Sequence, residues 1–307
     1  MMPAFTVLCG WCYKKGIKTL IQLKEGELLR NHTTFRIGGA AKYYALPKNA
    51  EEIMEAIDFA IVKGLPYYIL GKGSNVLFPD KGYPGVIIEV GKAMEKMEKT
   101  GEEEIRAQAG VSLSALSTFA AKEGLSGLEF ASGIPGTLGG AITMNAGAYG
   151  GEIKDCLTKA RAMDEDGNIR WLTTKELQLG YRSSLIQKKS YIVLEGVFRL
   201  NPGKTEEIQE KMKELNARRR DKQPLEYPSA GSTFKRPEGY FAGKLIEDAG
   251  LRGYRVGDAQ VSEKHCGFVI NRGEATCEEV LQCIRDVQEK VQEQFGVLLE
   301  PEIRIID

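Results

Sequence analysis

Residues 127–151 read GLEFASGIPGTLGGAITMNAGAYGG, and this stretch decides how the fold is interpreted. It holds eight glycines in 25 residues, while glycine accounts for 35 of the 307 residues of the whole chain. A flexible linker would be polar and rich in serine, but Ile, Leu, Met, Phe and Tyr alternate with these glycines. Because ordering so much glycine costs conformational entropy, we interpret the stretch as loop-like backbone that forms the wall of a cofactor site.

A second glycine loop, Gly71-Lys-Gly-Ser-Asn75, directly follows a predicted buried strand. Glycines at these positions allow backbone amides to approach an anion closely. The spacing is neither that of a Rossmann fingerprint nor that of a Walker loop, and a plain tight turn is the alternative. Two such loops in the N-terminal half favour a long dinucleotide held along its diphosphate.

The charge balance of the chain argues against several classes of partner. The 42 Lys and Arg residues equal the 42 Asp and Glu residues, so the net charge is zero. Bulk electrostatic attraction to nucleic acid or to an anionic membrane therefore does not explain the function of this chain. No apolar run reaches the roughly 18 residues that a membrane helix needs, and no Cys/His cluster has the spacing of a metal site.

The N-terminal segment supports a cytoplasmic location and contains one ambiguous motif. Its first cations, Lys14 and Lys15, follow the mildly apolar start, whereas a secretory signal has them in front. Cys9 and Cys12 have the spacing of a redox motif. Only eight residues precede Cys9, too few for the strand of a thioredoxin-like site, so we favour an N-terminal extension over residues 1–30.

Hydrophobic periodicity and capping residues predict the main elements. Helices are predicted over 49–63, 112–123, 206–219 and 276–295. Strands are predicted over 66–70, within 83–90, and over 105–109, 159–163, 168–173, 191–200 and 297–306. The elements lack a regular βαβ rhythm, which favours the α+β class. Asn201-Pro-Gly203 marks the predicted boundary between two domains.

Several motifs in one order give a more specific indication than any of them alone. The blocks are Asn31-His-Thr-Thr-Phe-Arg-Ile-Gly-Gly39, the loop 71–75, the segment 133–147, Tyr181-Arg-Ser-Ser184, Ala230-Gly-Ser-Thr-Phe-Lys-Arg-Pro237, His265-Cys-Gly-Phe-Val-Ile-Asn271 and Pro301-Glu-Ile-Arg304. The region from the first block to the last, residues 31–304, covers about nine-tenths of the chain. In this order the blocks resemble the UDP-N-acetylenolpyruvoylglucosamine reductases, also called UDP-N-acetylmuramate dehydrogenases or MurB.

The resemblance implies an FAD-binding domain of the vanillyl-alcohol-oxidase (PCMH) type over 31–200. A smaller α+β substrate-binding domain would follow over 201–307. It also implies NADPH as reductant and a cytoplasmic role in peptidoglycan precursor synthesis. NADPH and the enolpyruvyl UDP-sugar would share one cleft, and the protein is expected to be a monomer or a weak oligomer. Only about 35 residues separate Arg182 from Arg218, which matches the shorter type without the inserted tyrosine loop.

The resemblance also implies which residues hold FAD. They lie in the two glycine loops: Gly71, Gly73, Ser74, Asn75, Ser132, Gly133, Ile134, Gly136, Gly140, Asn145 and Gly147.

Three residues match the family's catalytic positions. In the implied reaction, hydride passes from NADPH to the flavin N5 and then to the vinyl carbon, and the neighbouring carbon is protonated. Arg182 would stabilise the developing negative charge, Glu302 would lie near the same carboxylate, and Ser232 would donate the proton. From the residues alone, Arg182 could form a structural ion pair, Glu302 has an equal neighbour in Glu300, and Thr233 is an alternative hydroxyl.

The substrate diphosphate requires cations, and the family-like segments provide several. The predicted substrate-binding residues are Tyr181, Arg218, Lys222, Lys235, Arg236, Lys244 and Asn271. The basic residues at the end of the helix 206–219 could equally complement its dipole at the surface. His265 lies in a matched block and is interpreted as structural.

Two other functions remain open at this level. One is a different FAD oxidoreductase of the same fold that uses oxygen as acceptor, which leaves the block 230–237 unexplained. The other is a non-catalytic nucleotide-sensing protein that retains the pocket.

Overall fold

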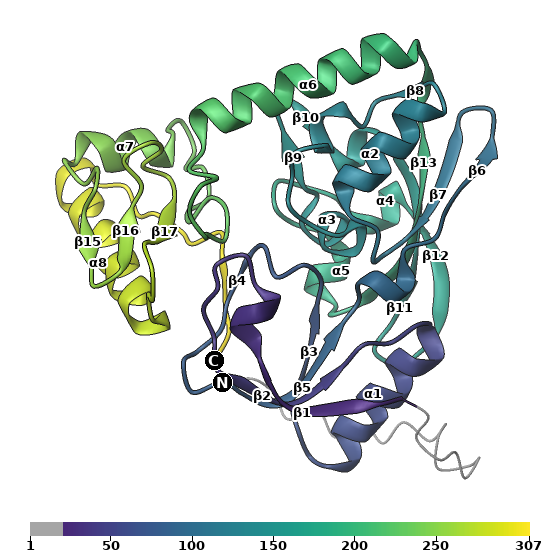
Figure 1. Ribbon diagram of the computed structural model, residues 1–307, viewed down its shortest axis with the longest axis horizontal. Coiled ribbons are helices and arrows are strands. Elements are labelled where there is room, and N and C mark those ends of the chain that lie inside the picture. Colours follow the sequence, from purple (N-terminus) through teal and green to yellow (C-terminus); the bar gives the residue numbers. More distant parts are fainter. Residues whose placement is uncertain (1–20) are drawn as a thin grey trace.

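The computed structural model describes residues 21–307, which form two lobes joined by a long helix (Figure 1). The larger lobe holds two sheets and α1–α5, and the smaller lobe holds a short sheet with α7 and α8. Helix α6 (Thr205–Lys222) runs from the larger lobe to the smaller one. The architecture is α+β, as predicted. Within residues 21–307, no helix has both the length and the apolar character needed to cross a membrane.

The first sheet of the larger lobe has the strand order β1-β2-β5-β3. Its strands are β1 (Leu23–Leu28), β2 (Ala40–Ala45), β3 (Tyr67–Leu70) and β5 (Tyr83–Glu89). Helix α1 (Ala50–Val62) begins after Asn49, whose side chain accepts a hydrogen bond from the Glu52 amide at 2.8 Å. The predictions for this helix and for β3 and β5 are confirmed.

Strand β1 corrects the predicted N-terminal extension. Leu23–Leu28 pairs antiparallel with β2 and forms the edge of the first sheet, so the extension predicted over 1–30 overlaps an integral strand. Residues 1–20, including Cys9 and Cys12, lie outside the described residues.

The second sheet has the order β12-β11-β13-β7-β6. Its strands are β6 (Met97–Gly101), β7 (Glu104–Gln108), β11 (Leu157–Met163), β12 (Ile169–Thr173) and β13 (Ile192–Arg199). The predicted hairpin is confirmed as the β11–β12 pair. Strand β13 is buried along nearly its whole length, which agrees with its almost continuous apolar sequence. Helix α2 (Leu113–Lys122) is capped by Ser112, as its sequence predicts.

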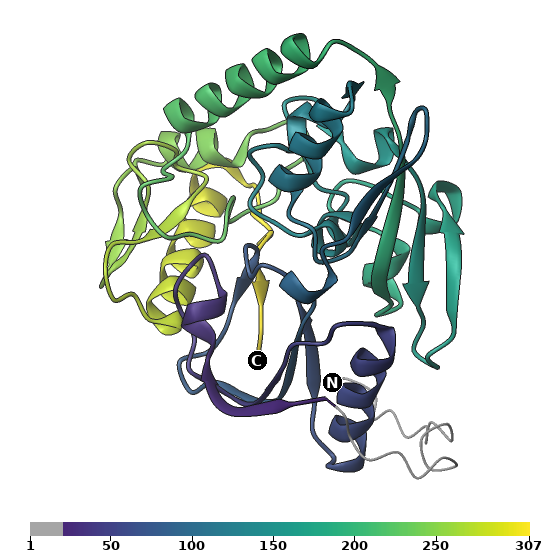
Figure 2. The ribbon, with the colours of Figure 1, turned by 45° about the vertical axis from the view of Figure 1, so that its right-hand side comes forward.

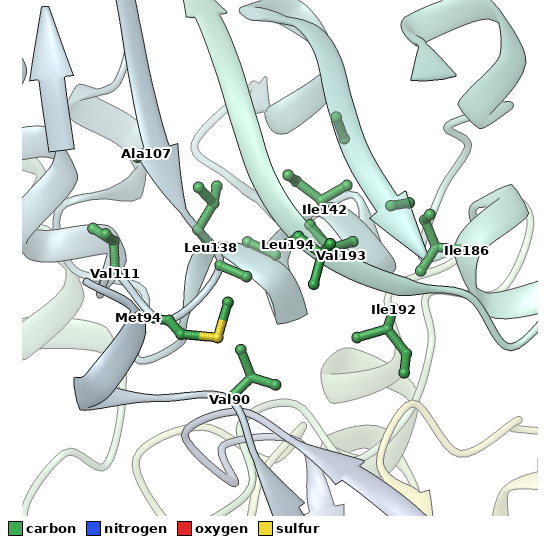
Figure 3. Packing of buried hydrophobic residues seen from close by; sticks show 14 of the residues in the cluster. Val90, Met94, Ala107, Val111, Leu138, Ile142, Ile186, Ile192, Val193 and Leu194 are labelled. Atoms are coloured by element: carbon green, nitrogen blue, oxygen red, sulfur yellow. The ribbon is translucent and has the colours of Figure 1, made fainter. Parts of the chain in front are cut away.

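The prediction that 127–151 is loop-like was wrong for its centre, where α3 (Leu138–Met144) forms. Thr137 is the N-cap, and its hydroxyl accepts a hydrogen bond from the Gly140 amide at 3.5 Å. Leu138 and Ile142 are fully buried. They pack beside β13 residues such as Val193 in the core (Figure 3). Burial of this short apolar face overrides the low helix propensity of the glycines.

The smaller lobe is built around α8 (Cys277–Phe295). Thr276 and Glu279 form the predicted capping box, and Gly296 ends the helix in a left-handed conformation with φ 67°. The predicted core face of α8 is buried. The neighbouring elements are α7 (Ala242–Asp248), β15 (Arg255–Val256), β16 (Ala259–Val261) and β17 (Val269–Asn271).

The remaining elements are short. They are η1 (Leu29–His32), β4 (Val76–Leu77), η2 (Lys92–Met94), β8 (Leu125–Ser126), η3 (Glu129–Ala131), β9 (Gly147–Ala148), β10 (Gly151–Glu152), η4 (Ile153–Asp155), α4 (Thr174–Leu177), α5 (Leu185–Lys188), β14 (Asn201–Pro202) and β18 (Arg304–Ile305).

The chain after α8 returns to the larger lobe. The predicted strand over 297–306 is confirmed only as β18, which pairs parallel with β4 of the larger lobe (Figure 2). Strand β14 also pairs with β8 of the larger lobe. The smaller lobe is thus connected to the larger lobe at both of its ends, through α6 and through β18.

Asp80 joins the two lobes through the N-terminus of α8. Its carboxylate accepts hydrogen bonds from the Cys277 amide at 2.9 and 3.0 Å and from the Glu278 amide at 3.4 Å. These amides have no partner within the helix, and a carboxylate there is favoured by the helix dipole. The larger lobe therefore supplies part of the cap of the main helix of the smaller lobe.

We expect Asp80→Ala to lower the free energy of unfolding by about 1–2 kcal/mol, because two amides of α8 lose a charged acceptor. Asp80→Asn should lie between wild type and Asp80→Ala, since the amide oxygen still accepts one bond. Urea unfolding of the three proteins measures the effect, with Glu102→Gln at an exposed turn as the control. Equal stability of Asp80→Ala and wild type would show that the cap contributes nothing.

Candidate active site

A cavity of about 540 Å³ lies where the two lobes meet. Both predicted glycine loops line it, together with residues of α6 and the segment 230–232 of the smaller lobe. Its size falls within the range typical of cofactor sites, roughly 300–1,000 Å³. Of the predicted cofactor residues, those that line this cavity are Gly71, Gly73, Ser74, Asn75, Ile134, Gly136, Gly140 and Gly147.

The glycines of this wall are required for two different reasons. Gly73 has a φ of 62°, and a Cβ there would lie 2.0 Å from the His32 carbonyl oxygen. Glycine at this position therefore allows the loop to fold. At Gly140, a Cβ would contact only the Thr137 hydroxyl, at 3.7 Å. Because the protein itself leaves that space open, Gly140 keeps room for a ligand.

Three predicted cofactor residues do not line the cavity but support its wall. The Ser132 hydroxyl donates to the Glu129 carbonyl at 2.9 Å. Gly133 packs against α6, where a Cβ would lie 2.4 Å from Asn216 Oδ1. Asn145 ends α3 with a φ of 43° and is almost fully buried. Sequence spacing alone could not separate lining positions from supporting ones.

Arg182 projects from a tight turn into both cavities. Gly180 and Ser183 exchange backbone hydrogen bonds of 3.0 and 3.2 Å, which leaves Arg182 with a φ of 51°. A positive φ is uncommon for arginine and marks a conformation that its surroundings must hold. The Asn145 amide provides such support by donating to the Gly180 carbonyl at 3.0 Å.

Glu302 meets Arg182 from the opposite lobe. Arg182 Nε donates to Glu302 Oε1 at 2.6 Å, and the two side chains are only 21% and 12% exposed. Burial raises the pKa of Glu302, while the adjacent Arg182 guanidinium acts in the opposite direction without cancelling the effect of burial. The pair therefore combines a fixed cation with a carboxyl group that is protonated more readily than usual.

Ser232 lies on the wall shared by the two cavities, together with Arg182 and Glu302. The alternative hydroxyl, Thr233, is buried and accepts a hydrogen bond from the Val269 amide at 2.8 Å. The structure thus brings the three predicted catalytic residues, which come from distant parts of the sequence, to one junction.

The second cavity, about 350 Å³, adjoins this junction and is lined mostly by residues of the smaller lobe. Three of the predicted substrate residues line it, namely Tyr181, Arg236 and Lys244. The Arg236 guanidinium lies 4.0 Å from the centre of the Phe241 ring. Other residues that line this cavity, among them Arg252, Lys264 and His265, were not predicted as substrate residues from the sequence. Cations thus outnumber carboxylates on this wall, which favours an anionic ligand.

The other predicted substrate residues line neither cavity. Lys235 pairs with Glu300 at 3.0 Å, and Lys222 is exposed at the end of α6. The Asn271 amide is buried and used within the fold, donating to Phe35 O at 3.2 Å and accepting from two backbone amides. The prediction that Asn271 reads the substrate is therefore corrected to a structural role.

Helix α6 presents Arg219 to the larger cavity in place of the predicted Arg218. Arg218 lies over the Tyr149 ring at 5.1 Å and lines neither cavity. Arg219 and Gln223 are one turn apart, so they share a helix face. Helical spacing from the buried Leu215 would have indicated Arg219, four residues further along the chain.

Arg219 and Gln223 also leave buried polar atoms unpaired. Among the residues that the structure describes, Arg219 Nε and Gln223 Oε1 are buried without a hydrogen-bond partner. Burial lowers the pKa of Arg219. Unpaired buried polar groups are costly, so their presence on the cavity wall indicates a ligand with anionic or polar groups.

Comparison with known proteins agrees with this geometry. A family described as the UDP-N-acetylenolpyruvoylglucosamine reductase C-terminal domain matches residues 223–306, and an FAD binding domain family matches residues 41–173. The chain is 55% identical to the UDP-N-acetylenolpyruvoylglucosamine reductase of Lachnoclostridium phytofermentans, over 95% of each chain. It is 48% identical to that of Clostridium tetani, over 96% of this chain and 97% of the relative.

A solved structure gives the same result. The crystal structure of UDP-N-acetylenolpyruvylglucosamine reductase (MurB) from Thermus caldophilus superposes with a TM-score of 0.82 at 35% identity, covering 94% of this chain and 100% of that chain. The two-lobed fold, the glycine-walled cavity and these comparisons lead to one conclusion. The chain belongs to the UDP-N-acetylenolpyruvoylglucosamine reductase family and is an FAD-dependent oxidoreductase.

Proposed function

We propose that this enzyme uses NADPH to reduce the enolpyruvyl ether of UDP-N-acetylglucosamine to the lactyl ether, which gives UDP-N-acetylmuramate. The main support for this proposal is that Arg182, Ser232 and Glu302 line the wall common to two adjoining cavities. One cavity has the size and glycine wall of a cofactor site, and the other is lined with cations. The names of the relatives support the same substrate. The proposed setting is cytoplasmic peptidoglycan precursor synthesis.

The residues of the larger cavity fit FAD. The open positions at Gly136 and Gly140 leave room for a ligand, and Arg219 has an unpaired donor for an anionic group. The loop Gly71–Asn75 would contribute backbone amides to the diphosphate. When bound, FAD supplies hydride chemistry between NADPH and the enolpyruvyl group.

Arg182 has the role of stabilising charge in this proposal. Hydride addition to the vinyl carbon drives negative charge into the adjacent carboxylate of the substrate. A guanidinium that is already fixed in a largely buried site stabilises such charge without reorganisation. Glu302 orients Arg182 through the 2.6 Å hydrogen bond. The raised pKa favours the protonated form of Glu302. In this form, its O–H group also donates a hydrogen bond to the substrate carboxylate.

Ser232 is the proposed proton donor. It protonates the carbon that neighbours the vinyl carbon to which hydride has been added. A serine hydroxyl is a weak acid, so it acts only on a carbon that already carries negative charge. Hydride addition creates this negative charge, and Arg182, which lies on the same wall, stabilises it. Arg236 and Lys244 would hold the diphosphate of the sugar nucleotide. NADPH also carries a diphosphate, so we propose that the two substrates use the cleft in turn.

The half-reactions provide the main test of this function. Under anaerobic conditions, NADPH should bleach the flavin, and the enolpyruvyl sugar nucleotide should restore its absorbance. Ser232→Ala should keep the rate of bleaching within about twofold and slow the recovery by about 10²-fold or more, because only the second step needs the proton. Ser229→Ala, in the same segment, is the control. Equal slowing of both steps would remove Ser232 from the role of proton donor, and rapid recovery with oxygen alone would indicate an oxidase.

Glu302→Gln separates catalysis from stability. The substitution should slow the recovery step by about 10²-fold. The pKa of Glu302 is raised on folding above its ordinary value of 4.5, so its stabilising contribution is present below 4.5 and is lost as the pH rises through the raised pKa. Glutamine cannot ionise, so the variant should have a melting temperature on the order of 1–3 °C higher at pH 8, and this difference should vanish towards pH 4.5.

The neighbouring Glu300→Gln is the control for that comparison, since Glu300 is exposed and paired with Lys235. It should leave the recovery rate and the pH dependence of the melting temperature almost unchanged. If Glu300→Gln and Glu302→Gln behave alike, Glu302 has no special role.

Gly140→Ala tests the cofactor wall. We expect the dissociation constant of FAD to rise about tenfold or more, because the new methyl group occupies space that the protein leaves open. The apoprotein should melt at the same or a higher temperature, since alanine favours a helix over glycine by about 0.5–1 kcal/mol. Fluorescence titration of apoprotein with FAD measures the effect, and Gly101→Ala outside the cavity is the control. Unchanged FAD affinity would contradict the assignment of the cavity.

A further inference from the structure

His265 lines the second cavity, and one side of its ring is held by the protein. The Gly267 amide donates to His265 Nδ1 at 3.1 Å, and the Phe268 amide donates to the His265 carbonyl at 3.0 Å. The ring also meets the Phe268 ring edge-on, with 5.0 Å between centroids. A Cβ at Gly267 or Gly243 would lie 3.0 or 3.2 Å from His265 Cε1. The glycines on both sides thus allow the ring to lie tightly against the backbone.

A chain of backbone hydrogen bonds runs from this ring to the catalytic residues. The Thr233 amide donates to the Gly267 carbonyl at 2.9 Å, and the Glu302 amide donates to the Thr233 carbonyl at 2.8 Å. Ser232 immediately precedes Thr233. Three consecutive hydrogen bonds therefore connect His265 with the peptide that carries Ser232 and with the backbone of Glu302.

The first bond of this chain requires a neutral imidazole. A backbone amide can only donate, so His265 Nδ1 must accept and the proton must reside on Nε2. Protonation of Nδ1 would set two N–H groups against each other and break the bond. Burial lowers the pKa of His265, and the charge of Lys222 acts in the same direction. Besides Arg182 and Glu302, the charged or titratable residues that line the same cavity are Tyr181, Arg236, Lys244, Glu247, Arg252, Lys264 and Cys266.

We propose that His265 is a positioning residue for the second half-reaction: by accepting the Gly267 amide, it fixes the backbone chain that aligns Ser232 with Glu302. This inference rests on the proposed function. It goes beyond that function because His265 itself transfers no proton and has no contact with the reacting atoms. A shift of about 1 Å in a catalytic group can cost about 10²-fold in rate, so a break in this chain should act mainly on the step that uses Ser232.

Three variants separate the roles of the two ring nitrogens. In His265→Asn the side-chain oxygen stands where Nδ1 stood, whereas in His265→Gln the amide group reaches the position of Nε2. His265→Ala removes both. The rates of flavin bleaching by NADPH and of recovery with the sugar nucleotide are measured for each variant under anaerobic conditions.

We expect His265→Asn to keep the recovery rate within about fivefold of wild type, and His265→Gln and His265→Ala to slow it at least tenfold, with bleaching unchanged in all three. The wild-type recovery rate should fall on the acid side, below the ordinary histidine pKa of about 6.5. The Asn variant should lose this acid limb, because its amide does not titrate. Rescue by Gln but not by Asn would overturn the proposal, as would equal slowing of both half-reactions in every variant.

The tautomer itself gives a readout that does not depend on activity. The chain has only two histidines, His32 and His265, so ¹⁵N-histidine NMR of the protein and of a His32→Gln variant resolves both rings. The Nε2–H tautomer of His265 at pH 7 supports the proposal, and an imidazolium there overturns it. If the wild-type flavin does not recover with the sugar nucleotide, the proposed function fails, and the NMR result still supports or overturns the hydrogen-bond chain from His265.

Discussion

The arrangement of the active site depends on the parallel pairing of β18 with β4. Strand β4 directly follows the glycine loop 71–75, and β18 follows Glu302 by one residue. The register aligns Arg304 with Val76, and the Arg304 amide donates to the Asn75 carbonyl at 2.9 Å. The side-chain amide of Asn75 in turn donates to the Glu302 carbonyl at 3.2 Å. A short pairing between the lobes therefore determines where the carboxyl group meets Arg182.

The Arg182–Glu302 pair is effective because its surroundings restrict both partners. Arg182 lies at a backbone conformation that is unfavourable for arginine, and Asn145 holds its turn. Glu302 is buried enough that its pKa rises even beside a guanidinium. Buried charge pairs often contribute little to stability after desolvation is counted. We therefore interpret this pair as a functional arrangement that the rest of the fold stabilises.

The sequence predicted the four longest helices, which are α1, α2, α6 and α8, because hydrophobic periodicity and terminal residues mark them. Helix α8 is the best example, because Thr276, Glu279 and Gly296 specify its ends. The sequence did not predict α3, because glycines obscured a short apolar face whose burial is a tertiary effect. It also did not predict that β18 is so short, since apolar residues alone do not indicate which backbone groups find a strand partner.

The catalytic positions were inferred from the family resemblance, and the structure brings Arg182, Ser232 and Glu302 to one junction. The substrate contacts were harder to predict, because a run of three basic residues does not indicate which one faces inward. The orientation of α6 about its axis decides which one it is. Arg219 lines the larger cavity, whereas Arg218 lies over Tyr149. The prediction that Asn271 binds substrate was wrong for a related reason. A buried side-chain amide can form hydrogen bonds within the fold as well as with a ligand.

The return of the chain to the larger lobe has a consequence for biosynthesis. Ribosomes make the larger lobe first, and domains generally begin to fold as they emerge. A nascent chain that ends before Glu302 has Arg182 without its carboxylate and β4 without its partner strand. Such a chain exposes an open strand edge, which invites pairing with other chains. Chaperone demand should therefore be greatest for ribosome-bound chains that have completed α6 but not yet β18.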